Sequence, residues 1–155
     1  MSKLKEADYY YGAVLSTLLN HDICPALIEG GKDRQIYDFT TNHKDFRLFL
    51  KYRSIPTVER QDYTSWQFVF SDEDIAELTE YMKMDLELSI GLVCGRKALP
   101  ESEYAVLHKD DIQKIFFDEG KKSLTISRKK GEHAFRISVG GGRDNAHKIK
   151  ANSLY

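Results

Sequence analysis

Positively charged side chains are concentrated at the end of the sequence, where they could bind phosphate groups. Residues 121–155 carry 9 Lys and Arg against 2 Asp and Glu, whereas residues 1–120 carry 14 against 22. The net charge of −1 therefore hides an acidic body and a basic C-terminal segment. When Lys and Arg side chains contact the phosphates of a nucleic acid, counterions are released. This release is a major source of affinity. The candidate phosphate-binding residues are Arg128, Lys129, Lys130, Arg136, Arg143, Lys148 and Lys150.

The sequence leaves open a second role for these cations, in ion pairs within the protein. They could pair with the acidic body of the same domain or of a second copy of the chain. The isoelectric point of about 6.5 is lower than is usual for a dedicated nucleic-acid-binding domain. The predicted partner is therefore a nucleic acid or an acidic protein surface.

Three consecutive glycines, Gly140 to Gly142, raise the question of a phosphate-binding loop. Such a loop requires a Lys-Ser or Lys-Thr pair and a following helix. Here Arg143 and Asp144 follow the glycines, and too little chain remains for a helix and a further strand. We therefore predict a turn, with backbone amides beside Arg143 that could contact a phosphate.

A second candidate surface lies in the middle of the chain. In the strand-like run 46–54, Arg47, Lys51 and Arg53 alternate with apolar residues and fall on one face. Trp66, with Tyr63, follows a short distance along the sequence, so the group could combine phosphate contacts with base stacking. The alternative is a solvated strand face whose long side chains cover apolar neighbours.

Hydrophobic periodicity predicts helices over residues 2–20, 71–84 and 109–117. In the second helix, Ser71 and Asp74 have capping-box spacing. The predicted strands are 24–29, 34–41, 46–54, 65–70, 88–95, 103–108, 123–129, 133–139 and an edge strand within 147–154, and the longest predicted loop is 55–64.

These elements predict one α+β domain over residues 1–155. We expect a mixed or mostly antiparallel sheet, with the N-terminal helix and a second main helix packed on it. The chain is 41% hydrophobic and 30% charged, as ordinary globular domains are. The domain is expected to end in a basic hairpin and tail, 121–155.

The order helix, three strands, helix, strand in the first ninety or so residues resembles the PD-(D/E)xK nuclease fold. The resemblance implies an acid on the second strand and an acid-x-lysine on the third, which together hold Mg²⁺ or Mn²⁺. Asp38 matches the first acid and Lys51 the lysine, but Phe49 stands where the second acid is required. Glu6 or Glu29 could supply the missing carboxylate. The chain is also similar to small bacterial and phage proteins.

Several other functional classes find little support. The histidines at 21, 43, 108, 133 and 147 lack the spacing of a zinc site, and no GxSxG motif is present. No cofactor is predicted apart from the divalent metal of a nuclease. Cys24 and Cys94 stand alone, which favours buried free thiols and a cytoplasmic location. No run approaches the roughly 20 apolar residues needed to cross a membrane.

The sequence therefore favours a non-catalytic binding module that contacts nucleic acid through its basic C-terminal segment. Two alternatives remain open. One is a metal-dependent nuclease of the PD-(D/E)xK type or its inactive relative. The other is a protein-interaction subunit or homo-oligomer in which acidic and basic ends pair. The sequence does not predict an oligomeric state.

Overall fold

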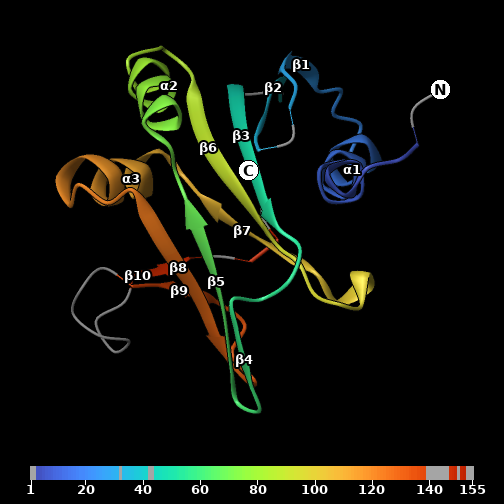
Figure 1. Cartoon of the computed structure of the whole chain (residues 1–155). Coiled ribbons are helices and arrows are strands. Elements are labelled where there is room, and N and C mark those ends of the chain that lie inside the picture. The colour runs from blue at the N-terminus through green and yellow to red at the C-terminus, as the bar shows by residue number, and fades with distance from the viewer. Residues whose placement is uncertain (1–2, 32, 42–43, 139–146, 150, 153–155) are drawn as a thin grey trace.

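The computed structural model describes residues 3–31, 33–41, 44–138, 147–149 and 151–152 (Figure 1). The helices are α1 (Glu6–Asn20), α2 (Asp72–Met82) and α3 (Lys109–Ile112), and a π-helical segment (Gln113–Asp118) continues α3. The strands are β1 (Ala26–Glu29), β2 (Gln35–Thr40), β3 (Asp45–Arg53), β4 (Val58–Arg60), β5 (Tyr63–Val69), β6 (Glu87–Cys94), β7 (Glu103–Leu107), β8 (Ser123–Lys129), β9 (Phe135–Ile137) and β10 (His147–Ile149).

The described strands form two five-stranded sheets, not the single sheet that the sequence suggested. Sheet A has the order β1-β2-β3-β6-β7, and its β3–β6 pair is parallel. Sheet B has the order β10-β9-β8-β5-β4 and is antiparallel throughout. The chain leaves sheet A after β3, forms the β4–β5 hairpin of sheet B, and returns through α2 to β6. The predicted α+β class with mostly antiparallel pairing is confirmed.

Helix α1 covers one face of sheet A. Its buried residues Tyr11, Val14 and Leu18 belong to the same apolar cluster as Leu48 and Leu50 of β3. Successive side chains of a strand point to opposite faces, so these two leucines share the α1 side. The alternation predicted for residues 46–54 is therefore observed.

The opposite face of sheet A packs against sheet B and the other helices (Figure 1). The larger core cluster joins Phe49 and Ile90 of sheet A to Trp66 and Phe68 of sheet B, with Leu78 of α2. Strands β3 and β6 of sheet A are thus buried on both faces, whereas sheet B buries the face that it turns toward sheet A.

The predicted loop 55–64 instead contains β4 and the beginning of β5. The two strands are joined by a two-residue turn, Gln61 and Asp62. Strand β4 lies at the edge of sheet B, and its residues Glu59 and Arg60 are exposed. An edge strand of this kind lacks the apolar alternation that marks a strand in a sequence.

The two cysteines have different surroundings. Cys94 is buried in the core, whereas Cys24 is exposed, and both are free. Within the described residues, no helix has the length and apolar character required to span a membrane.

Gly95 allows a close approach between the end of β6 and the end of β3. A Cβ atom at Gly95 would lie 2.4 Å from the carbonyl oxygen of Arg53. The Gly95 N–H donates to that oxygen at 2.8 Å, and the Gly95 carbonyl accepts from the Trp66 indole at 2.8 Å. The contact between the ends of β3 and β6 and the hydrogen bond of the Trp66 indole therefore both require a residue without a side chain at this position.

We predict that Gly95→Ala lowers the free energy of unfolding by roughly 1–3 kcal/mol, because the added methyl overpacks a rigid backbone contact. Gly12→Ala is the matched control, since a Cβ atom at this α1 position meets nothing within 4 Å. It should raise stability by about 0.5–1 kcal/mol. Urea unfolding measures both, and equal effects of the two substitutions would contradict the steric argument.

Candidate nucleic-acid interface

Sheet B has one apolar face and one polar face. In β5, Trp66 and Phe68 are buried toward sheet A, whereas Gln67 and Val69 are exposed on the other side. Tyr63 shares the side of Gln67 because side chains alternate along a strand. We call this side of sheet B the outer face. Its members by strand register are Val58, Arg60, Tyr63, Ser65, Gln67, Val69, Ser123, Thr125, Ser127, Lys129, Arg136 and Lys148.

The strand registers bring cations together on the outer face. Tyr63 is paired with Arg60 of β4 on one side and with Lys129 of β8 on the other. Arg136 of β9 is paired with Lys148 of β10. Side chains at directly paired positions lie on the same face of a sheet. Four cations from four strands therefore project from one surface.

Most of this charge is not neutralised by the described part of the chain. Arg60, Lys129 and Lys148 are exposed and form no ion pair with the described residues. Arg136 pairs with Glu132, with 3.1 Å between Nε and Oε2. The outer face consequently carries a local excess of positive charge.

Arg128, which the sequence grouped with these residues, points the opposite way. Its guanidinium pairs with Glu103 of β7, donates to the carbonyl of His133 at 2.8 Å and lies 3.9 Å from the centroid of the Phe135 ring. Arg128 therefore ties sheet B to sheet A. Of the other predicted ligands, Arg143 and Lys150 lie outside the described residues.

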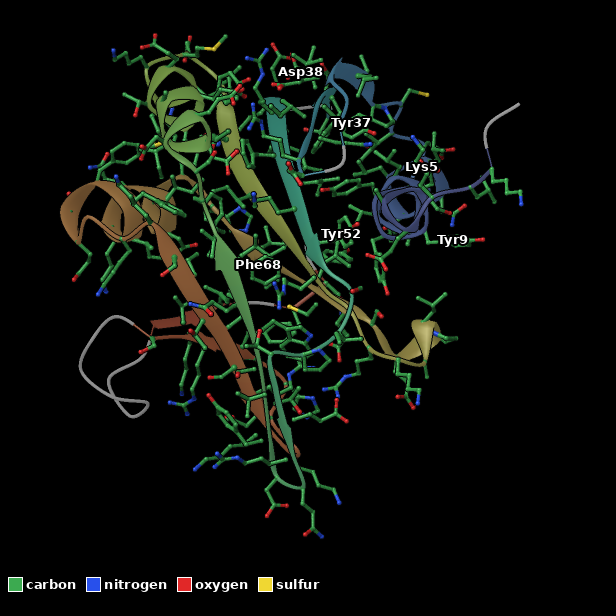
Figure 2. All side chains as sticks on the ribbon, viewed as in Figure 1. Lys5, Tyr9, Tyr37, Asp38, Tyr52 and Phe68 are labelled. Atoms are coloured by element: carbon green, nitrogen blue, oxygen red, sulfur yellow. The ribbon has the colours of Figure 1, made fainter. Side chains whose placement is uncertain are left out.

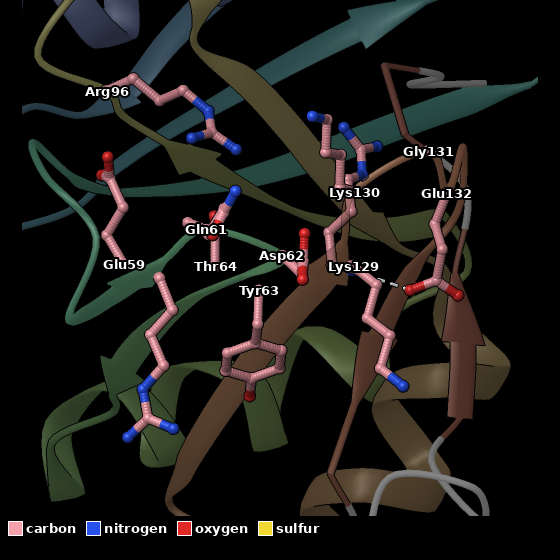
Figure 3. A pocket seen from close by; sticks show the side chains of 12 residues that line it. Glu59, Gln61, Asp62, Tyr63, Thr64, Arg96, Lys129, Lys130, Gly131 and Glu132 are labelled. Carbon is pink, nitrogen blue, oxygen red and sulfur yellow. Dashed lines mark hydrogen bonds between the residues drawn. The ribbon is translucent and has the colours of Figure 1, made fainter.

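A pocket of about 610 Å³ lies at the end of the hairpins (Figure 3). Figure 3 shows Tyr63 and Lys129 extending together to one side, whereas Arg96 and Lys130 lie on the other. The pocket lining includes Arg60, Arg96, Arg128, Lys129 and Lys130 together with Glu59, Asp62 and Glu132. Opposite charges are mixed in this pocket, which shares Arg60, Tyr63 and Lys129 with the outer face.

Sequence reasoning missed Arg60 and Arg96. The sequence predicts a loop at Arg60, although Arg60 and Tyr63 flank a two-residue turn, which is the spacing of a tight hairpin. Arg96 gave no local signal. Its guanidinium lies 5.1 Å from the Trp66 ring centroid, a contact between segments distant in the sequence.

The second candidate surface does not come together as an exposed group. Trp66 is 1% exposed, and Lys51 is buried beside Asp74. Arg47 pairs with Asp38 and lies 4.7 Å from the ring centroid of Tyr81. Arg53 alone of the four is exposed. The tryptophan ring is thus part of the core and offers no face to a base.

Asp38 and Lys51 lie apart and have different partners. Asp38 accepts from Arg47 through both carboxylate oxygens, at 2.7 and 2.9 Å. Arg47 is four residues from Lys51 along β3, which corresponds to roughly 13 Å. Figure 2 accordingly shows Asp38 near the start of β3 and Tyr52 near its end. Among the described residues, no three His, Cys, Asp or Glu side chains gather in a way that could hold a metal ion.

Lys51 instead joins a buried charge network at the beginning of α2. Its Nζ lies 3.0 Å from Asp74, which also pairs with Arg34 at 2.7 Å. Arg34 contacts three further carboxylates, those of Glu29 at 3.1 Å, Glu73 at 2.9 Å and Glu77 at 2.6 Å. Asp74 also accepts from the Ser71 amide at 2.9 Å, which completes the predicted capping box. One carboxylate thus caps α2 and neutralises two cations.

The network shifts the pKa of two carboxyl groups in opposite directions. Burial raises the pKa of Asp74, but the Ser71 amide, Lys51 and Arg34 together outweigh burial and lower it below its ordinary value. Burial and a hydrogen bond with Glu29 raise the pKa of Glu77. Asp74 is therefore held as a carboxylate, which suits a structural counterion.

Comparison of the chain with protein-family models, with curated proteins and with solved structures gave no match.

We predict that Asp74→Asn lowers the free energy of unfolding at pH 7 by roughly 3 kcal/mol, because it leaves Lys51 buried without its counterion. Asp74 has a lowered pKa in the folded state, so its stabilisation is present above the ordinary carboxyl range. That stabilisation is lost as the pH falls through the lowered value. The difference between wild type and variant should therefore shrink in acid.

Denaturant unfolding between neutral and acid pH tests this expectation. Glu73→Gln is the control, because Glu73 also contacts Arg34 but its side chain is 74% exposed. An exposed pair of this kind contributes at most about 1 kcal/mol. A difference for Asp74→Asn that stayed constant down to strong acid would argue against the ionised carboxylate as its cause.

Proposed function

We propose that this protein is a non-catalytic nucleic-acid-binding module whose binding surface is the outer face of sheet B. One observation carries the proposal: strand register puts Arg60, Lys129, Arg136 and Lys148 on a single polar face. Three of these cations belong to the basic C-terminal segment. Because they project from paired strands, little backbone ordering accompanies binding.

The charge distribution supports a defined orientation on a polyanion. The carboxylates around Arg34 lie on α2 and near β1, and Figure 1 shows α2 at the opposite end of the molecule from the β4–β5 turn. The electrostatic field of a charged partner orients a molecule whose acidic and basic regions are separated. The small net charge of −1 is therefore compatible with binding through one surface.

The order of elements in sheet A also bears on the nuclease hypothesis. Helix α1, strands β1 to β3, helix α2 and strand β6 follow one another, and β4 and β5 are diverted to sheet B. However, Asp38 is paired with Arg47, and Lys51 is paired with Asp74. These residues do not fit a magnesium or manganese site, so no metal-dependent step is assigned. A nuclease-like order of elements without a fitting metal site favours an inactive relative of the nucleases over an active nuclease.

We predict that the purified protein leaves supercoiled plasmid, linear duplex and single-stranded DNA intact in the presence of Mg²⁺ or Mn²⁺. The expectation follows from the pairing of Asp38 and Lys51 within the protein. Gel electrophoresis over a time course measures it. Metal-dependent cleavage that disappears in Asp38→Ala would overturn the non-catalytic assignment.

We predict that the protein binds nucleic acid with an affinity that falls steeply with salt. If all four outer-face cations contact phosphates, log K should fall by roughly 3 per log unit of salt on a single strand. The double variant Lys129→Gln/Lys148→Gln should reduce this slope by about 1.4. Fluorescence anisotropy at several salt concentrations measures the slope.

The control is Lys44→Gln/Lys83→Gln, which changes the net charge equally. Lys44 and Lys83 are exposed and lie outside sheet B, near Glu87 and Glu80. This variant should keep the wild-type slope. Equal losses in both double variants would mean that overall charge, not the outer face, determines binding.

A further inference from the structure

Tyr63 occupies the centre of a short row of cations on the outer face. Arg60 of β4 and Lys129 of β8 are its directly paired neighbours. Neighbouring strands lie about 4.8 Å apart, so a cation flanks the tyrosine closely on each side. Tyr63 is half-buried and lies next to the β4–β5 turn, so part of the residue is accessible.

A surface that binds only phosphates requires cations but no aromatic ring. The ring of Tyr63 could in addition stack on a base. Duplex DNA hides the faces of its bases within the stack and presents phosphates and groove edges. An unpaired base exposes its face and stacks on aromatic side chains, while the backbone follows nearby cations. A tyrosine between two cations on the outer face matches the second arrangement.

Resting on the proposed function, we propose that the outer face of sheet B binds single-stranded nucleic acid, with one base stacked on Tyr63 and the adjacent phosphates on Arg60 and Lys129. The backbone then continues across the sheet toward Arg136 and Lys148, which are paired positions on the two outermost strands. The chemical class of the ligand is thus a flexible strand with accessible bases, DNA or RNA.

If Tyr63 has a purely structural role, its variants should behave differently. The ring would then cover the aliphatic parts of Arg60 and Lys129, and any apolar side chain of similar size could replace it. Tyr63→Leu keeps apolar area and removes the stacking face, whereas Tyr63→Phe keeps both. Comparison of these two variants separates stacking from packing.

The experiment measures binding of the full chain to labelled oligonucleotides of about 16 nucleotides, the upper end of ordinary single-strand site sizes. The probes are single-stranded DNA, single-stranded RNA and the DNA duplex of the same sequence, at one salt concentration. We expect at least one single strand to bind about tenfold more tightly than the duplex. Tyr63→Leu should weaken that binding about tenfold, and Tyr63→Phe should retain it.

Tyr9 supplies a matched control, because it is 52% exposed but lies on α1, away from sheet B. Tyr9→Leu should bind like wild type. Thermal unfolding of each variant establishes that it is folded. A second measurement uses Tyr63→Trp, whose added indole fluorescence should be quenched by the single-stranded probe, whereas that of Tyr9→Trp should not.

Different outcomes separate this inference from the proposed function. If wild type binds with the expected salt slope but Tyr63→Leu binds single strands equally well and Tyr63→Trp shows no quenching, the stacking inference is overturned and the proposed function stands. Duplex binding as tight as single-strand binding also overturns the inference. If no probe binds even at low salt, both fail.

Discussion

The central strands of sheet A must be covered on both faces, and this requirement sets the positions of α1, α2 and sheet B. Strands β3 and β6 pair in parallel in the interior of the sheet, and such a pair is stable when both of its faces are covered. Helix α1 covers one face, whereas sheet B, α2 and the α3 region cover the other. Sheet B supplies only one apolar face to this core. Its second face is therefore left to polar and charged side chains.

This arrangement gives consecutive residues of one strand opposite roles. Arg128 points inward, where Glu103 neutralises it and Phe135 packs against it. Lys129 points outward and has no ion pair with the described residues. A basic cluster in the sequence is thus divided between a contact that joins the sheets and a surface that faces solvent. Only the outward half of the cluster is available to a ligand on the outer face.

The charge network around Asp74 illustrates how a residue pattern associated with chemistry can be structural. Lys51 is nearly buried, and a buried ammonium group requires a counterion. Asp74 supplies one from the first turn of α2, and its lowered pKa keeps it ionised. Arg34 binds the same carboxylate and three others, so the β1–β2 connection is held against α2. A lysine committed to this network has little freedom to assist a reaction.

Most of the helices and strands could be predicted from the sequence, because their signals are local. Alternation placed Leu48 and Leu50 opposite Phe49, and the spacing of Ser71 and Asp74 predicted the capping box of α2. The hairpin of β8 and β9 and the edge strand β10 were also predicted. Strand β4 was not, because an exposed edge strand of three residues carries no apolar period. Three features could be seen only in the folded chain: the strands form two sheets, Trp66 is buried, and Arg60 joins Lys129 around Tyr63. Strand pairing and face orientation depend on partners far along the chain, so no local pattern specifies them.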